Sequence, residues 1–198
     1  MIINEKNLNL VGAETKEYNS GEYIFQEGDP PLYCYYIVEG EVKLNSYNKD
    51  GKEFILNILT NGQTFGESFL FINKIYPMDA IALRGCTIMR LCKKKFDDLL
   101  KLHPHLCFDI CKSLSERLYY QYLMLRSNSS QNPAERITGV MDYFKCTEED
   151  QTQFSFKVPL TRQQLASFTG MCLETAIRTV KTLEKDGKIK IENRKILY

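Results

Sequence analysis

The hydrophobic residues of the chain follow two different periods, and the change between them divides it. Between residues 18 and 91, short runs rich in β-branched and aromatic residues alternate with glycines and with Asp-Pro or Asp-Gly pairs. Such punctuation predicts strands at residues 23–25, 35–38, 42–44, 54–59 and 87–91. Because no long amphipathic pattern interrupts them, we expect a β-barrel or jelly roll and not a parallel α/β sheet.

After residue 93 the apolar positions recur at helical spacing. Residues 96–102 predict a short helix that ends before His103 and Pro104, and a longer helix is expected from His105 to about Arg126. The apolar positions of this second helix lie close to heptad spacing, with Ile110 and Tyr122 beside them and Gln121 as a polar interruption: Cys107, Cys111, Leu114, Leu118 and Leu125. A helix of this kind is expected to pack against a second copy of itself.

The last third of the chain begins with a polar segment. Residues 127–133, which are Ser- and Asn-rich and end in proline, predict a hinge, and residues 134–144 predict an amphipathic helix. Residues 148–154 are expected to form a solvated loop. Residues 187–198 alternate like a two-stranded wing that turns at Asn193.

Residues 160–183 contain the pattern that is most informative about function. Thr161 and Gln164 have capping-box spacing, and Gly170 predicts a tight turn between two short helices. The buried stripe is predicted to comprise Leu165 and Phe168 in the first helix and Ala176, Val180 and Leu183 in the second. The opposite face of the second helix carries Glu174, Thr175, Arg178 and Lys181. This arrangement predicts a helix-turn-helix, whose second helix fits the major groove of DNA.

Composition and charge agree with this prediction. The chain has 198 residues, of which 43% are hydrophobic and 12% aromatic, as in ordinary globular proteins, and its formal net charge is +1. Between residues 161 and 198, eight basic residues face four acidic ones, which gives a local balance of +4. The positive charge therefore lies where phosphate binding would need it.

Several protein classes are disfavoured by the sequence. There is no apolar run of about 18 residues and no signal-peptide pattern at residues 1–6, so neither membrane association nor secretion is expected. Seven cysteines without a Cys-x-x-Cys pair predict a cytoplasmic protein with reduced thiols. No nucleophile–base constellation, phosphate-binding glycine loop or metal cluster at diagnostic spacing is present, so we expect neither an enzyme nor a bound cofactor.

Three stretches in order resemble the Crp/Fnr superfamily of bacterial transcription regulators. They are residues 21–44, the turn Gly62-Gln-Thr-Phe-Gly-Glu67, and the helix-turn-helix with Thr161-Arg-Gln-Gln-Leu-Ala and Glu174-Thr-Ala-Ile-Arg178. The resemblance implies an α+β protein in three parts. These are a cyclic-nucleotide-binding-type β-roll (jelly roll) at 1–103, a dimerisation helix and hinge at 104–130, and a winged helix-turn-helix at 131–198.

The resemblance also assigns residues to DNA. Arg178 would donate to guanine and Glu174 would accept from the cytosine amino group, while Arg162, Gln163, Thr175 and Lys181 would hold phosphates. Two positions depart from the family. Leu173 replaces an arginine of the cyclic-AMP-type members, and Ile177 replaces a base-contacting serine of the Fnr-type members. Either residue could contact a thymine methyl group, so the outer half-site is left open.

An effector pocket is implied around Gly66, Glu67, Met78 and Asp79. Cyclic-nucleotide-binding members also need an arginine for the phosphate, but residues 75–82 contain none, Asp79 would repel an anion, and Arg84 lies too far along. Cyclic AMP is therefore disfavoured, and Glu67 could equally belong to a turn that holds no ligand. The cysteines of the iron–sulfur members are missing before Cys34.

Other candidate groups each have two interpretations. Cys107 and Cys111 could supply zinc ligands or a disulfide across a dimer axis, or could be small apolar residues. Cys86 and Cys92 are too far apart along one strand to form a disulfide. His103 and His105 could ligate haem or simply be solvated, and the run of lysines at 93–95 predicts a solvated face.

The sequence thus predicts a homodimeric regulator that binds a palindromic promoter site and contacts RNA polymerase. Its roll would respond to an unknown small-molecule effector and shift the dimer between two arrangements. The alternative is a small-molecule-binding or thiol-redox sensor module with little or no specific DNA binding. An assay with a scrambled DNA site separates these two hypotheses.

Overall fold

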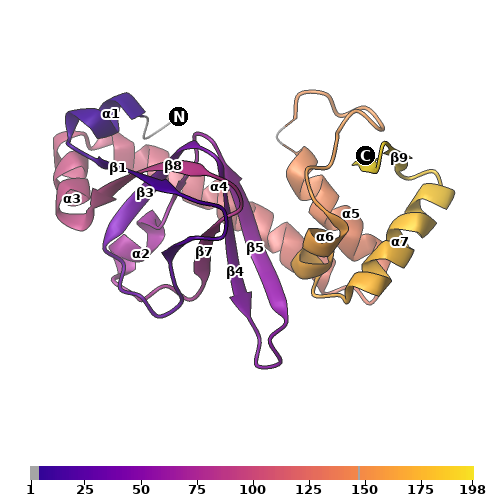
Figure 1. The fold of residues 1–198 in the computed structure, drawn as a ribbon. Helices are drawn as coiled ribbons and strands as arrows, with labels where there is room; N and C mark the ends of the chain where they lie inside the picture. The colour runs from indigo at the N-terminus through magenta and orange to yellow at the C-terminus, as the bar shows by residue number, and fades with distance from the viewer. Residues whose placement is uncertain (1–4, 147) are drawn as a thin grey trace. The chain divides into compact units, whose positions relative to one another are not determined.

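The computed structural model describes residues 5–146 and 148–198 and separates into two compact units (Figure 1). The N-terminal unit comprises the described residues up to 51 together with 55–115. The C-terminal unit comprises 52–54 together with 116–198. The three-part division expected from the resemblance, at 103/104 and 130/131, stays a prediction.

Two four-stranded sheets form the β-roll of the N-terminal unit. The first has the order β1-β8-β3-β6 and the second β2-β7-β4-β5. The strands are β1 (Glu14–Tyr18), β2 (Tyr23–Phe25), β3 (Tyr33–Glu39), β4 (Glu41–Tyr47), β5 (Glu53–Thr60), β6 (Thr64–Phe65), β7 (Asp79–Ala82) and β8 (Cys86–Cys92). The five strands expected from the sequence are confirmed, and β1, β6 and β7 are additional.

Aromatic rings fill the space between the two sheets. The rings of Phe25 and Tyr76 stack with centroids 3.7 Å apart, and those of Tyr35 and Phe65 stack at 4.9 Å. Ile37 and Ile88, which are opposite each other in the pairing of β3 and β8, are fully buried in the same cluster. Four of these six core residues lie in strands that the sequence predicted, whereas Phe65 and Tyr76 lie outside them.

A second core cluster lies between the first sheet and helices α1 (Glu5–Leu10), α2 (Glu67–Ile72) and α3 (Lys93–Leu102). Leu8, Leu70 and Phe96 bring one buried side chain from each helix. Helix α3 begins at Lys93, whose side chain is half-buried, whereas Lys94 and Lys95 are exposed, so the predicted solvated face is confirmed for these two lysines only. The Nζ atom of Lys93 donates to the carbonyl of Leu70, and that of Lys95 donates to the carbonyl of Gly12.

The long helix α4 (His105–Asn128) is confirmed, and three of the five predicted seam positions, Cys111, Leu118 and Leu125, are exposed on it. Cys107 and Leu114 pack, partly buried, against the same cluster as Leu106 and Ile110. Among the exposed positions of α4, six recur at alternating spacings of three and four, and all but Ser115 are apolar: Phe108, Cys111, Ser115, Leu118, Tyr122 and Leu125. We call this set the α4 stripe. The prediction missed the burial of Cys107 and Leu114 because the sequence did not show which apolar residues the roll would cover.

The C-terminal unit contains helices α5 (Pro133–Lys145), α6 (Arg162–Thr169) and α7 (Leu173–Lys185) and the hairpin β9 (Lys190–Glu192) and β10 (Lys195–Leu197). Its buried core includes Ile137, Val140 and Met141 of α5. The predicted wing is confirmed, and its turn uses positive φ at Asn193 and Arg194. Residues 156–158 add backbone hydrogen bonds to Ile196 and Tyr198 beside the hairpin.

Candidate DNA-binding surface

Local sequence signals hold the two helices of the helix-turn-helix in place. The Thr161 hydroxyl accepts from the backbone N–H of Gln164, and the Gln164 side chain accepts from the N–H of Thr161, which completes the predicted capping box. Gly170 ends α6 in the left-handed region with φ 65°, a conformation that glycine adopts without strain. The turn predicted at Gly170 is confirmed.

The buried side of α7 packs on α5 and α6. Ala176, Val180 and Leu183 are each at most 1% exposed, and Leu165 and Phe168 of α6 are equally buried. These are the five apolar positions that the sequence assigned to the interface. Because the apolar face fixes the rotation of α7, the residues on the opposite side must face away from the core.

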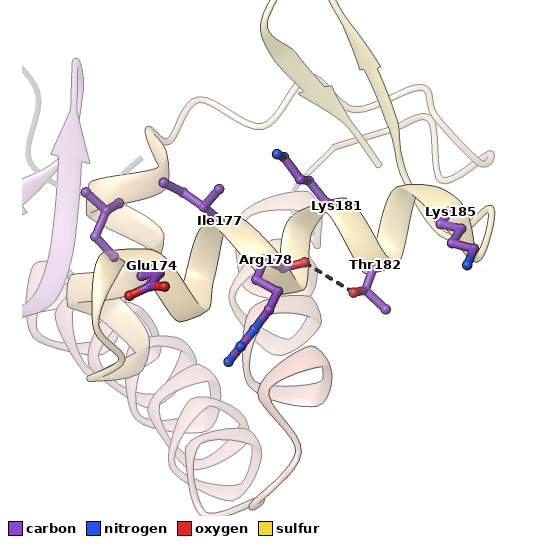
Figure 2. Close-up of a pocket in the computed structure, with 7 residues that line it drawn as sticks. Glu174, Ile177, Arg178, Lys181, Thr182 and Lys185 are labelled. Atoms are coloured by element: carbon purple, nitrogen blue, oxygen red, sulfur yellow. Dashed lines mark hydrogen bonds between the residues drawn. The ribbon is translucent and has the colours of Figure 1, made fainter.

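The exposed side of α7 carries two parallel rows of side chains spaced by four residues. One row is Leu173, Ile177 and Lys181, and the other is Glu174, Arg178 and Thr182; together with Lys185 they line a shallow surface depression. Figure 2 shows Ile177 and Lys181 on one side of the helix and Glu174 and Arg178 on the other. A charged row and a largely apolar row thus lie side by side.

Glu174 and Arg178 present their charged groups to solvent. Both side chains are exposed, and within residues 5–146 and 148–198 they form no ion pair with each other. The carbonyl of Arg178 accepts from the hydroxyl of Thr182 at 3.2 Å, a contact within the helix that leaves the guanidinium group unaffected. Both side chains therefore remain able to contact a ligand.

The remaining predicted DNA-binding residues lie around α7. Gln163 and Lys181 are exposed, whereas Thr175 is half-buried. Arg162 at the start of α6 donates to the carbonyl of Arg194 at 2.6 Å and so ties the helix-turn-helix to the turn of the wing. A guanidinium group has five N–H donors, so this bond leaves others for a phosphate.

Residues that the site prediction omitted also lie on this surface. Thr182 and Lys185 line the depression on α7, and Arg194 occupies the turn of the wing. Lys185 and Arg194 were both counted in the +4 charge balance of residues 161–198. The sequence could also have placed Lys185 on this face, because it lies four residues after Lys181 in the same helix. The position of Arg194 depends on the fold of the wing against α6.

Cys172 stands directly before α7 as its N-cap residue. Its thiol is exposed and lies 3.1 Å from the hydroxyl of Thr175. Hydrogen bonding to Thr175, first from the side chain and then from the backbone N–H, lowers the pKa of this thiol below its usual value. Sequence reasoning did not single out Cys172, because neither the apolar stripe nor the charged face of the helix-turn-helix includes it.

The predicted effector residues lie at the start of α2 and at the start of β7. Gly66 has φ 84° and precedes α2, and Glu67 is the first residue of that helix, 2% exposed. A Cβ atom on Gly66 would lie 3.0 Å from the Tyr35 ring and 3.1 Å from the carbonyl of Tyr33, so only glycine fits there without displacement. The turn is therefore explained by packing, whether or not it also binds a ligand.

Met78 and Asp79 lie at the entry to β7. Met78 packs partly buried against the aromatic core, and a carboxylate oxygen of Asp79 accepts from the backbone N–H of Glu27 at 2.8 Å. Burial raises the pKa of Tyr35 and Tyr76 in the neighbouring core well above the usual range. The assignment of Gly66, Glu67, Met78 and Asp79 to an effector site stays a prediction.

In the part of the chain that the structure describes, the cysteines and histidines that were considered as metal or haem ligands do not form a common site. The seven cysteines are free thiols, and within the described ranges no group of three or more His, Cys, Asp or Glu side chains is arranged to hold a metal ion. Cys111 is exposed, whereas Cys107 is half-buried against the roll. The rings of His103 and His105 meet edge to face at 5.8 Å. Of the helices that the structure describes, none is long and apolar enough to cross a membrane.

The chain therefore combines a β-roll, a long helix and a winged helix-turn-helix whose exposed face is partly cationic, the architecture of a DNA-binding regulator. Comparison with known families agrees. Residues 15–103 match the cyclic nucleotide-binding domain, and residues 135–198 match the Crp-like helix-turn-helix domain. The chain belongs to the Crp/Fnr superfamily of transcription regulators.

Individual relatives are similar over nearly the full chain. The cAMP-activated global transcriptional regulator CRP of Haemophilus influenzae is 26% identical over 190 residues, which cover 95% of this chain and 85% of the relative. Among solved structures, the c-di-GMP-responsive regulator CLP of Xanthomonas campestris aligns with a TM-score of 0.78 and 21% identity, over 97% of this chain and 96% of that one. FixK2 of Bradyrhizobium japonicum aligns with a TM-score of 0.76 and 18% identity, over 93% and 91%. At these identities the solved structures support the fold.

Proposed function

We propose that this regulator binds a palindromic promoter site as a homodimer and reads each half-site with the exposed face of α7. Arg178 donates a pair of hydrogen bonds to guanine, and Glu174 accepts from the amino group of cytosine. Arg162, Gln163, Thr175 and Lys181 contact phosphates, joined by Lys185 and by Arg194 of the wing.

One observation carries this proposal: Glu174 and Arg178 are exposed, make no ion pair with each other within the described residues, and project from a helix whose opposite face is fully buried. A reading helix needs side chains that are held in register but are not already satisfied within the protein. The four-residue spacing places both side chains on one side of α7, so they can reach neighbouring base pairs together.

Dimerisation follows from the α4 stripe. Its exposed apolar residues have the heptad spacing of a two-stranded coiled coil, and pairing two copies about a two-fold axis would bury them. The two α7 helices would then face successive major grooves, which matches a palindrome with half-sites about one helical turn apart. The protein acts in the cytoplasm, where the promoter-bound dimer contacts RNA polymerase.

The roll supplies regulation without cyclic AMP. Asp79 is engaged with the backbone of Glu27, and no arginine lies within residues 75–82 to neutralise a cyclic phosphate. We expect DNA affinity to be unchanged by cyclic AMP, and any effector of the roll to be a different small molecule. Measurement of DNA binding with and without the nucleotide checks this.

Selection of binding sites from a random DNA library, followed by affinity measurements on the selected and a scrambled site, tests the function. Arg178→Ala should cost about 1–3 kcal/mol on the selected site and relax the preference at one base pair. Lys181→Ala should instead weaken binding to both DNAs about equally and reduce the salt dependence. Equal, weak binding of the unmodified protein to every sequence would favour the alternative of a small-molecule or thiol-redox sensor module.

A further inference from the structure

Two large apolar side chains lie on the exposed face of α7. Leu173 and Ile177 are each 39% exposed, although the core of the C-terminal unit already has its complete apolar stripe from Ala176, Val180 and Leu183. They stand four residues apart in one row and therefore on the same side of the helix. Packing of the C-terminal unit does not require apolar residues at either position.

The neighbours of this apolar pair indicate what would cover it. Glu174 and Arg178 form the adjacent row, and Lys181 follows Ile177 in the apolar row (Figure 2). An apolar protein partner would have to bury these charges, at a cost of several kcal/mol for each unpaired group. The major groove of DNA offers the required mixture, because it combines hydrogen-bonding base edges, phosphates and the apolar 5-methyl group of thymine.

We propose that Leu173 and Ile177 are specificity-determining residues that contact thymine 5-methyl groups in the half-site. This inference rests on the proposed function, since it assumes that α7 enters the major groove. Thymine is the one DNA base that presents a methyl group there, so an apolar side chain favours it over the other three bases. The polar row then selects G·C and the apolar row selects T·A beside it.

Helix geometry limits where these thymines lie. Four residues advance an α-helix by about 6 Å, and base pairs are stacked about 3.4 Å apart along each strand. When the helix follows the groove, Leu173 and Ile177 contact base pairs that are about two steps apart. The selected half-site should contain T·A pairs at two positions with this separation, flanking or interleaved with the G·C pair that needs Arg178.

Replacement of thymine by deoxyuridine provides a direct test, because it removes only the methyl group and leaves base pairing intact. On the selected site, deoxyuridine at each of the two positions should weaken binding by the unmodified protein about fourfold, which corresponds to about 0.8 kcal/mol. Deoxyuridine at thymines elsewhere in the DNA should leave affinity unchanged. This comparison requires no protein variant to fold.

Variants of the protein then show which of the two side chains contacts which thymine methyl group. Leu173→Ala should abolish the thymine–deoxyuridine difference at one position and Ile177→Ala at the other, while each retains the difference at its partner's position. Thr182→Ala is the matched control, because it lies on the same exposed face outside the apolar row and should retain both differences.

The outcomes separate this inference from the proposed function. Sequence-specific binding that depends on Arg178 but is equal for thymine and deoxyuridine would overturn the methyl readout and leave the DNA-binding function intact. Absence of any sequence preference would overturn both. A methyl effect that persists in Leu173→Ala and Ile177→Ala would assign the contact to other residues and would also overturn the inference.

Discussion

Gly139 of α5 lies so close to Ser127 of α4 that a Cβ atom on Gly139 would fall within 3.0 Å of both the Cβ and the Oγ atom of Ser127. In the middle of an exposed helix, glycine is about 1 kcal/mol less favourable than alanine, so Gly139→Ala would normally stabilise α5. Because of the contact with Ser127, we expect this substitution to destabilise the protein instead. We expect Gly139→Ala to lower the free energy of unfolding by about 1–3 kcal/mol, as measured by chemical denaturation.

A second substitution identifies the clash as the cause. Combination of Gly139→Ala with Ser127→Gly removes the obstructing Cβ atom and should recover part of the lost stability, even though glycine near the end of α4 is itself unfavourable. Combination with Ser127→Ala keeps the Cβ atom and should recover much less. If both double variants were equally stable, the crowding between α4 and α5 would not explain the loss.

The α4 stripe predicts that substitutions at two neighbouring residues of α4 have different effects on dimer stability. Tyr122 belongs to the stripe and is 61% exposed, whereas Gln121 lies outside it, although the sequence placed Gln121 at a seam position. Tyr122→Glu would bury a charge beside its symmetry mate, so the dimer dissociation constant should rise at least about a hundredfold. Gln121→Glu should change it little. Sedimentation equilibrium measures both, and a larger effect of Gln121→Glu would restore the seam expected from the sequence.

The buried tyrosines of the roll predict loss of stability in alkali. Burial raises the folded-state pKa of Tyr35 and Tyr76 above the value of about 10 found in an unfolded chain. The unfolded state therefore releases these protons first, so the stabilisation is fully present below pH 10 and is lost as pH rises above it. Each group contributes a slope of at most about 1.4 kcal/mol per pH unit.

Denaturation of Tyr35→Phe at pH 8 and pH 11 tests this linkage. The variant should lose less stability between the two pH values than the unmodified protein, because it has one phenol fewer to ionise. Tyr23→Phe is the matched control, since the Tyr23 ring is exposed in an edge strand of the roll, and its loss should equal that of the unmodified protein. Equal losses in all three proteins would show that ionisation of Tyr35 does not drive alkaline unfolding.

Local patterns in the sequence were sufficient for most of the fold. The strands with dense β-branched and aromatic residues and the capping box at Thr161 and Gln164 could be predicted because their signals lie within a few residues. The strand β1 could not, because four of its five residues are exposed and its sequence, Glu-Thr-Lys-Glu-Tyr, has no apolar alternation. Pairing with β8 supplies its stability, and that partner is distant in the sequence.

Helical periodicity alone was enough to predict which residues of α7 face away from the core. Glu174 and Arg178 could be placed on the exposed side of α7 from the apolar stripe opposite them. Periodicity could not predict the contact of Arg162, because its hydrogen bond to the carbonyl of Arg194 depends on the wing folding back against α6. The burial of Cys107 and Leu114 in α4 was missed for the same reason, because the roll covers both side chains through tertiary packing.

The thiol of Cys172 predicts a chemical probe of the DNA-facing end of α7. Hydrogen bonding to Thr175 lowers the pKa of the thiol, so a larger fraction is thiolate near neutral pH and alkylation is faster. Thr175→Val removes the hydroxyl and should slow alkylation of Cys172 by about two- to tenfold, because the thiolate loses one hydrogen bond. Thr182→Val, which also changes a threonine of α7, should leave the rate unchanged.

Protection by DNA extends the use of this probe to function. Because Cys172 immediately precedes the helix that carries Glu174 and Arg178, a half-site bound to α7 should shield the thiol from an alkylating reagent, and peptide mass spectrometry after timed quenching would measure the rate. The selected DNA site should slow labelling of Cys172 at salt concentrations where a scrambled site does not. The exposed thiol of Cys146, which follows α5, is the internal reference and should label at the same rate with either DNA. Equal protection of both thiols would indicate general shielding instead of a half-site seated on α7.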